Sequence, residues 1–363
     1  MLLPPLIGHL ETRHRLAQAV RGDTLPQVLL FTGPTGIGKQ RLALWLAQLI
    51  FCERDETEPC GSCRACRLVA GLSHADLHWF VPIARPKAGD PDKQVDEAAE
   101  TLAGVMEERR KRPLYAPADG MSSHSIASVR LLQRRAALRP VEGERRVFII
   151  GEADRLVPQE SSPEAANATL KLLEEPPPGA VFVLTTVDAR RVLPTIRSRA
   201  APIRLHRLAD DEVRRFLAEH TEPRWSSEKI EARVEVADGS IGMALSEGEE
   251  AGKAYRSAEQ LLAAVMEGRG PALERALSQA TYSARGEFSA MLDALAETLG
   301  EAARGTMGQP VRRNVPQPLL RHRSPGPLLQ AMEKVVEARE AASGNVNPQI
   351  LLAVLGEELA EVL

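Results

Sequence analysis

The 363-residue chain is poor in aromatic side chains, which make up 4% of it, and it has no strong excess of charge of either sign. A core with so few rings must be built from Leu, Ala, Val and Ile, and these residues suit helices and buried parallel strands. The formal net charge of −3 provides no global positive field toward DNA. Any contact with nucleic acid therefore needs a local patch or a partner protein.

Long apolar runs are also missing. No segment approaches 18 uninterrupted apolar residues, and the opening Met1–Pro5 lacks the basic start and apolar stretch of a signal peptide. We therefore expect a soluble, cytoplasmic protein that has no membrane partner and keeps its cysteines reduced. At roughly 100–200 residues per domain, the length corresponds to two or three domains.

The first two hundred residues alternate short apolar runs with helical patterns, which predicts an α/β domain with a parallel sheet flanked by helices. After about residue 207 the strand signals stop, and only helical patterns follow. We expect strands at 28–32, 77–82, 146–150, 180–186 and 201–205, and helices at 40–51, 125–138, 163–175, 208–220, 226–237 and 240–247. The stretch 85–123, rich in Pro, Gly and charge, is interpreted as a solvated surface insertion with one helix at 95–111.

A glycine-rich loop, GPTGIGK at 33–39, follows the first predicted strand and opens a helix. This is the phosphate-binding P-loop pattern in its required context. Glycines allow backbone N–H groups to surround phosphate oxygens, and the lysine adds positive charge at the outer phosphates. The candidate nucleotide-binding residues are Gly33, Gly36, Gly38 and Lys39.

The loop lacks the residues that would hold a magnesium ion. Position 40, where a Ser or Thr hydroxyl should ligate Mg²⁺, is Gln40. The strand at 147–150 runs into Gly151 and Glu152, where the usual order is Asp then Glu. Because two ligands of the same Mg²⁺ ion are missing, the sequence favours a chain that does not hydrolyse ATP. The alternative is a degenerate but active site that uses Asp154 or water-mediated coordination, and whether ATP still binds is open.

All four cysteines, Cys52, Cys60, Cys63 and Cys66, lie within fifteen residues in the pattern C-x7-C-x2-C-x2-C. Four thiolates suit a closed, tetrahedral, structural Zn²⁺ site. An iron–sulfur cluster or a redox disulfide is the alternative. A site filled by four sulfurs leaves no position for water, so we expect no catalysis by the metal.

Several other charged residues have an ordinary structural interpretation. His74, His78 and His124 are expected to be packed or surface histidines rather than ligands. The basic run 109–112 is interpreted as the C-terminal end of a helix, where positive charge is favoured, rather than as a nucleic-acid patch.

Taken together, the motifs resemble those of bacterial clamp-loader AAA+ subunits over nearly the whole chain. The segments that carry the resemblance are LIGH at 6–9, AANATLKLLEEPP at 165–177, the strand-ending Thr185-Thr186, TIRSRA at 195–200 and NVNP at 345–348. The resemblance implies an AAA+ P-loop domain at 1–207 with a zinc module at 52–66, a helical lid at 208–248 and an all-helical collar for oligomerisation at 249–363.

Within that family, the motor subunits gamma and tau carry an Arg in a G-S-x-R lid sensor, and here Gly242 replaces it. The pattern is similar to the family's stationary end subunit. In the family, the arginine that corresponds to Arg199 points into the neighbour's ATP site and acts there in trans. The alternative is that Arg199 makes a surface salt bridge.

The resemblance implies a subunit without intrinsic ATPase activity in the DNA polymerase III holoenzyme. Its expected role is to complete the clamp loader, supply Arg199 to a neighbour and help load the sliding clamp during replication. The implied partners are the gamma/tau and delta subunits, with the sliding clamp and primer–template DNA reached through the complex. The alternatives are an active AAA+ ATPase motor of gamma/tau type and a zinc-dependent DNA-binding module.

Overall fold

The computed structural model describes residues 3–54, 56–112, 114, 122–156, 164–221, 223–246, 248–280, 287–309, 311, 315–322, 324–342 and 346–363. The chain divides into two compact units, Met1–Leu245 and Ser246–Leu363, and each is described separately. In the part of the chain that the structure describes, no helix is long and apolar enough to cross a membrane.

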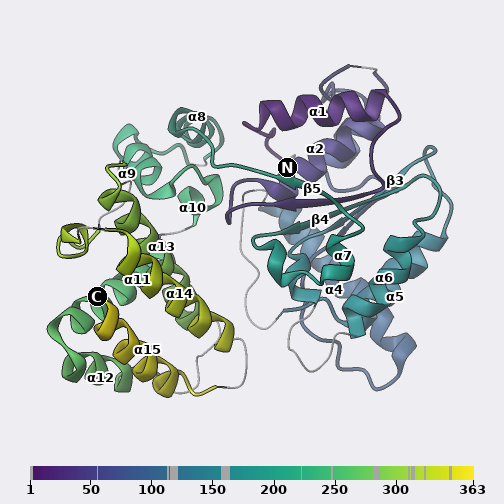
Figure 1. Cartoon of the computed structure of the whole chain (residues 1–363). Helices are drawn as coiled ribbons and strands as arrows, with labels where there is room; N and C mark the ends of the chain where they lie inside the picture. The colour runs from purple at the N-terminus through teal and green to yellow at the C-terminus, as the bar shows by residue number, and fades with distance from the viewer. Residues whose placement is uncertain are drawn as a thin grey trace. The chain divides into compact units, whose positions relative to one another are not determined.

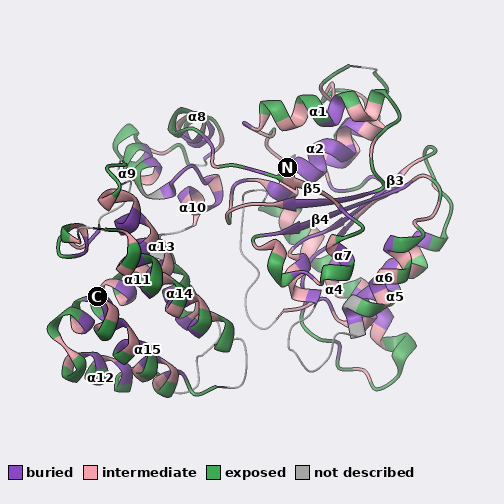
Figure 2. Cartoon of the chain, in the orientation of Figure 1, coloured by how far each residue is buried: buried purple, intermediate pink, exposed green. Residues whose placement is uncertain are grey.

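The first unit is built on a five-stranded parallel sheet with the strand order β2-β3-β4-β1-β5. Its strands are β1 (Val28–Thr32), β2 (Leu77–Phe80), β3 (Arg146–Ile150), β4 (Ala180–Thr186) and β5 (Ala201–Arg204). Every residue of β3 and β4 is buried, as Figure 2 shows for the centre of the sheet. Strands covered on both faces must be continuously apolar, and this explains the VFII and AVFVL runs.

Helices cover both faces of this sheet (Figure 1). In Figure 1, α1 (Leu10–Arg21) and α2 (Lys39–Phe51) lie on one side of the sheet, and α5 (Ile126–Ala137) and α6 (Glu164–Glu174) lie on the other. The remaining elements of this part are α3 (Arg64–Ala70), α4 (Pro91–Lys111), η1 (Ala153–Leu156), η2 (Ala189–Arg191) and α7 (Pro194–Arg197). The parallel α/β fold expected from the alternating pattern is confirmed.

Three short helices complete the first unit: α8 (Asp210–His220), α9 (Ser227–Ala237) and α10 (Ile241–Leu245). They have a small apolar core of their own, centred on Val213, Leu217 and Ala237. Gly239, before α10, lies directly against the backbone of Leu208. A Cβ at this position would be 2.4 Å from the Leu208 carbonyl oxygen. Gly239 also has a positive φ of 69°, so two constraints favour glycine there.

Helices are the only regular secondary structure among the described residues of the second unit. Its elements are α11 (Gly248–Glu267), α12 (Arg269–Leu277), α13 (Glu287–Thr306), η3 (Leu319–Arg321), α14 (Gly326–Ala341) and α15 (Pro348–Val362). Leu261, Leu295 and Leu352, from three different helices, belong to one buried apolar cluster. This core shares no residue with those of the first unit.

One expectation from the sequence is wrong. The predicted solvated insertion contains α4, which is longer than expected and packs against α5. Val95, Ala98 and Leu102 of α4 are buried in the core of the sheet domain. Their i, i+3, i+7 spacing puts them on one helix face, and this spacing was the signal for burial. Residues 113 and 115–121 of the predicted insertion, and Asn345 of the NVNP segment, lie outside the described residues.

Candidate functional site

The P-loop connects β1 to α2, and its three glycines have positive φ angles of 146°, 73° and 99° at Gly33, Gly36 and Gly38. Only glycine adopts such angles readily, so the motif fixes the local turn. Lys39 is buried, and its Nζ donates hydrogen bonds of 2.7 and 2.6 Å to the carbonyl oxygens of Gly33 and Pro34. Burial lowers the pKa of Lys39 to about 8, against the opposing influence of Asp154 and Glu152.

The short helix α10 contacts the tip of this loop. The backbone N–H of Gly242 donates to the Gly36 carbonyl oxygen at 2.9 Å, and Ser240 Oγ donates to the Thr35 carbonyl oxygen at 2.8 Å. A Cβ on Gly242 would lie 2.5 Å from the Gly36 Cα. The absence of a side chain at Gly242 therefore allows a backbone contact with Gly36 that any Cβ would block.

Gln40 occupies the space beside Gly151. A Cβ on Gly151 would lie 2.8 Å from Gln40 Nε2 and 2.9 Å from Gln40 Oε1. The amide thus fills the volume into which an Asp at position 151 would extend. The two departures from the P-loop pattern seen in the sequence are in contact, and each accommodates the other.

Two further residues hold the Gln40 amide, and sequence reasoning missed both. Trp79 of β2 donates its indole N–H to Gln40 Oε1 at 3.0 Å. Arg109 of α4 donates to the same oxygen at 3.5 Å, and its guanidinium carbon lies 4.1 Å from the centre of the Trp79 ring. The C-terminal end of α4 therefore contacts Gln40, the residue that follows the P-loop. The favourable interaction of positive charge with a helix C-terminus does not explain this contact. No sequence signal connects positions so far apart.

The acidic residues after β3 are engaged within the protein. Asp154 Oδ1 accepts a 2.7 Å hydrogen bond from Thr186 Oγ1. Glu152 pairs with Arg155 at 2.9 Å, while its backbone N–H donates to Thr185 Oγ1 at 3.2 Å. The two threonines that end β4 therefore face the acidic turn, as their position in neighbouring parallel strands requires.

Arg199 lies just after α7 and is about one-third exposed. Its Nη2 forms an ion pair of 2.5 Å with Glu174 Oε1 at the end of α6, and its Nη1 donates to the Thr195 carbonyl oxygen at 2.7 Å. In the single chain, Arg199 is thus in a surface salt bridge. Such exposed pairs contribute little to stability, typically about 0–1 kcal/mol.

The four cysteines form one cluster. The Sγ atoms of Cys52, Cys60, Cys63 and Cys66 all lie within 4.8 Å of one another. Tetrahedral zinc with Zn–S bonds of about 2.3 Å needs sulfurs roughly 3.8 Å apart, so the cluster fits a metal ion of this kind.

Backbone N–H groups point at the sulfurs of this cluster. Cys60 Sγ accepts from the Cys63 N–H at 3.3 Å, and Cys63 Sγ accepts from the Cys66 N–H at 3.4 Å. The first of these bonds lowers the pKa of Cys60 to about 6, whereas burial raises the pKa of Cys66. N–H donors of this type stabilise thiolates, the form that binds metal.

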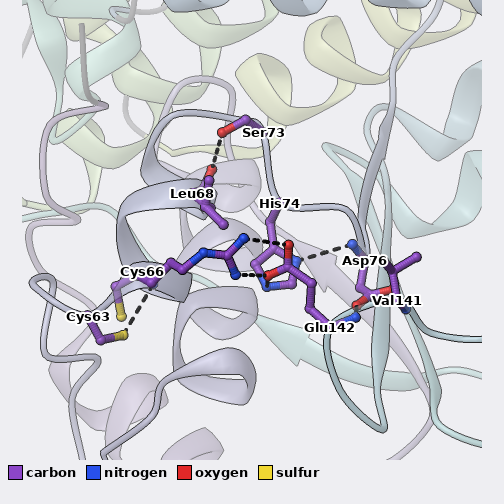
Figure 3. Close-up of polar contacts among 9 residues, drawn as sticks. Cys63, Cys66, Leu68, Ser73, His74, Asp76, Val141 and Glu142 are labelled. Carbon is purple, nitrogen blue, oxygen red and sulfur yellow. Dashed lines mark hydrogen bonds and ion pairs between the residues drawn. The ribbon is translucent and has the colours of Figure 1, made fainter.

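A polar network fastens the cysteine module to the sheet domain. Arg64, between the third and fourth cysteines, forms a two-pronged ion pair with Glu142 at 2.7 and 3.2 Å. Figure 3 shows Asp76 beside His74 and the backbone of Val141 and Glu142. The Asp76 carboxylate accepts hydrogen bonds from the backbone N–H groups of Val141 and Glu142 at 2.7 and 2.8 Å. His74 also stacks on Phe51, the residue before the first cysteine, with 4.1 Å between ring centres.

The other histidines singled out in the sequence are packed inside the first unit. His124 is buried, and its Nε2 donates to the Gly151 carbonyl oxygen at 2.6 Å. His78 stacks on Phe148 with 4.8 Å between ring centres. Burial lowers the pKa of each to about 4. Neither belongs to a cluster of metal-binding groups among the described residues.

Residues 8–209 match the family model described as DNA polymerase III, delta subunit. The chain belongs to this family. The match covers the P-loop, the cysteine module, the five strands and Arg199, which are the parts from which the site is built.

The chain is also similar to DNA polymerase III subunits of two kinds, delta′ and gamma/tau. The DNA polymerase III subunit delta′ of Bacillus subtilis (strain 168) is 30% identical over 51% of this chain and 43% of its own length. The delta′ subunit of Pseudomonas aeruginosa is 31% identical over 47% of this chain and 40% of its own length. The gamma/tau subunit of Mycobacterium tuberculosis (strain ATCC 25618 / H37Rv) is 29% identical over 59% of this chain and 30% of its own length. The matched regions thus span less than half of each relative.

Proposed function

We propose that this chain is the clamp-loader subunit that takes part in the loader without hydrolysing ATP, the role implied by its resemblance to the stationary subunit. The contact between Gln40 and Gly151 carries the proposal. Hydrolysis in P-loop enzymes needs Mg²⁺ held by a Ser or Thr hydroxyl and an Asp. Here Gln40 and Gly151 stand at these two positions, and the Gln40 amide lies against Gly151 and accepts a hydrogen bond from the Trp79 indole, which supports the proposal.

The second part of the proposal is that Arg199 acts on a neighbouring subunit. Negative charge grows on the γ-phosphoryl oxygens as the bond to the leaving group breaks, and a planar guanidinium contacts two such oxygens at once. Arg199 is accessible and its ion pair with Glu174 is exposed, so a phosphate of higher charge in a neighbour's site outcompetes the carboxylate. The arginine then stabilises the transition state without a change in this chain's fold.

The remaining parts of the chain receive structural roles under this proposal. The cysteines at 52–66 hold one structural zinc ion, and their donor set and N–H···S contacts support this assignment. Residues 208–248 form the lid, and residues 249–363 form the collar that assembles the ring with the gamma/tau and delta subunits. The sliding clamp and primed DNA are reached through that complex.

The experiment is to reconstitute the loader from gamma/tau, delta and either the wild-type chain or the Arg199→Ala chain. We expect equal assembly but lower DNA-stimulated ATPase activity and slower clamp loading with the variant. An arginine finger contributes on the order of 10³-fold or more at the site it serves, and the loss for the whole complex is smaller because other sites continue to turn over.

Arg214→Ala is the matched control, because Arg214 is also an exposed arginine in an ion pair, with Glu231 at 2.6 Å. It should leave both activities unchanged. Arg199→Lys should resemble the alanine variant more than the wild type, since lysine keeps the charge but not the planar fork. Equal turnover and equal loading with the wild-type and Arg199→Ala chains would show that Arg199 is only a surface residue.

A further inference from the structure

A small cavity lies beside the edge strand β2, where side chains of β2, α4 and α5 meet. Its volume is about 160 Å³, close to the roughly 150 Å³ that holds a benzene-sized ligand. Ala103 and Arg110, two of its lining residues, are exposed, so the cavity can be reached from solvent. The apolar side chains that line it are Leu72, Leu77, Trp79, Leu102 and Met106. One group of leucine or phenylalanine size therefore fits this space.

Two arginines supply the polar part of the lining. Arg110 is held in place, because its Nε and Nη2 donate to the carbonyl oxygens of Gly71 and Leu72 at 3.1 and 2.8 Å. Arg135 of α5 is half-buried, and its guanidinium carbon lies 5.6 Å from the centre of the Phe80 ring. Among the described residues, no hydrogen bond or ion pair engages the Arg135 guanidinium. Burial lowers the pKa of Arg135, and no carboxylate opposes this effect.

The surroundings of Arg135 carry an excess of positive charge. Arg146 Nη1 donates to the Arg135 carbonyl oxygen at 3.1 Å, and Arg146 Nε is enclosed without a hydrogen-bond partner among the described residues. Asp76, the acid whose charge acts on Arg146, already accepts two backbone N–H groups. A guanidinium that is partly removed from water favours a carboxylate partner. The apolar side chains beside it favour a ligand that combines a single negative charge with an apolar body.

We infer that this cavity binds a carboxylate that carries one apolar group of leucine or phenylalanine size. The apolar group packs against Leu102 and Met106, and the carboxylate pairs with Arg135. Two sources offer this chemistry, the C-terminal residue of a polypeptide and a free branched-chain or aromatic acid. The inference goes beyond the proposed function, because neither ATP nor the site of a neighbouring subunit takes part.

The test is isothermal titration of the full-length chain with two matched pairs of probes. N-acetylleucine and N-acetylleucinamide represent a polypeptide terminus with and without its charge, and 4-methylpentanoate and 4-methylpentanamide do the same for a free acid. We expect an acid to bind about ten-fold or more tightly than its amide, as for a charged hydrogen bond. Binding of N-acetylleucine identifies a polypeptide terminus as the source, and binding of 4-methylpentanoate alone identifies a free acid.

The tryptophan indole signals in a nuclear magnetic resonance spectrum locate the bound acid. The chain has three tryptophans, of which Trp79 lines the cavity and Trp45 and Trp225 do not. The acid should shift the Trp79 signal, assigned with Trp79→Phe, and leave the other two in place. A shift confined to Trp45 or Trp225 would place the ligand elsewhere and overturn the inference.

Arg135→Met separates a binding role of this arginine from a structural one. The variant should bind the acid about ten-fold or more weakly and the amide unchanged, so that the preference for the acid disappears. An arginine that only supports the fold would affect acid and amide equally. Arg134→Met is the matched control, because Arg134 is the preceding residue of α5 and forms an exposed ion pair with Asp92 at 2.5 Å. It should change neither affinity.

Ala103→Leu provides a second variant that does not touch the charge. Ala103 is an exposed helix position, so the larger side chain should leave the fold intact and fill the space that the ligand needs. It should weaken binding of acid and amide alike. Gly104→Leu, at the next residue, is the control, because nothing lies within 4 Å of a Cβ there.

Failure of both acids to bind at millimolar concentration would overturn the inference. Equal affinity for acid and amide in the wild-type chain, or unchanged affinity in Ala103→Leu, would do the same. The Ala103→Leu comparison keeps the inference open to refutation if Arg135→Met does not fold.

Discussion

A Cβ on Gly151 would lie 2.8 Å from Nε2 of Gln40, although the two residues are 111 positions apart in the chain. A carboxylate at position 151 and an amide at position 40 cannot share that volume. The two residues therefore act as a pair: an Asp at position 151 alone would collide with the Gln40 amide, and a Thr at position 40 alone would leave the Trp79 indole without its acceptor.

This pairing predicts the outcome of a double-mutant cycle on stability. Gly151→Asp overpacks the site and buries a carboxylate, and should lower the free energy of unfolding by about 1–3 kcal/mol or more. Gln40→Thr removes the acceptor of the Trp79 indole and should cost about 1–3 kcal/mol. The double variant should lose less than the sum of the two. The measurement is urea unfolding, with Gly143→Asp as the control because nothing lies within 4 Å of a Cβ there. Strict additivity would show that the two sites are independent.

The isolated chain should release no phosphate from ATP in a Mg²⁺-dependent reaction, because Gln40 and Gly151 stand at the two positions where P-loop enzymes hold the ion with a hydroxyl and an aspartate. A sensitive phosphate-release assay on the purified chain measures this directly. The Lys39→Ala variant identifies contamination, since activity from a contaminating enzyme survives the substitution. Steady release by the wild-type chain that Lys39→Ala abolishes would contradict the prediction.

The purified chain should contain about one zinc ion after exhaustive dialysis, because four sulfurs saturate a tetrahedral site. Cys66→Ser should lose the metal and unfold at a lower temperature, since metal binding and folding are coupled at structural sites. Elemental analysis and thermal unfolding provide the two measurements. Ser62→Ala is a nearby control, because Ser62 is exposed, lies outside the group of four cysteines and donates only a long hydrogen bond of 3.7 Å to Cys60 Sγ. Iron with a visible absorption band would identify a cluster instead.

Stability should fall as the pH drops from about 6.5 toward 4, partly through His124. The folded-state pKa of His124 is lowered by burial to about 4, so between these values the unfolded chain binds a proton that the folded chain does not. The contribution is complete above pH 6.5 and falls by up to about 3 kcal/mol as the pH approaches 4. His124→Gln keeps a donor for the Gly151 carbonyl but does not titrate.

The decisive quantity is therefore the difference between the unfolding free energies of wild type and His124→Gln as a function of pH. This difference should change between pH 6.5 and about 4. The same difference for His14→Gln, at an exposed histidine, serves as the reference. A pH-independent difference for His124→Gln would show that His124 does not titrate as burial requires.

Removal of residues 249–363 should abolish assembly with partner subunits and leave the remaining chain folded and able to bind zinc. The reason is that the apolar core of the second unit shares no residue with the cores of the first. Size-exclusion chromatography with the partner subunits tests assembly, and zinc content tests folding of the truncated chain. Normal assembly by the truncated chain would show that the collar lies elsewhere.

Much of the sheet domain follows from local sequence. Continuous apolar runs such as 146–150 predict buried strands because both faces of a parallel sheet are covered, and β3 has these bounds. The P-loop and the cysteine spacing are equally local, since the groups that make each site lie within fifteen residues. Short-range geometry therefore determined the strands, the phosphate loop and the clustering of the thiols.

Tertiary structure alone decided what surrounds those motifs. Gln40, Trp79, Arg109 and Gly151 come from four separate segments, and only the sheet order and the packing of α4 bring them together. The pairing of Arg199 with Glu174 and the contact of Gly242 with Gly36 are decided in the same way. A sequence pattern indicates which chemical groups lie together in a short segment, whereas contacts between distant segments depend on how the whole core packs.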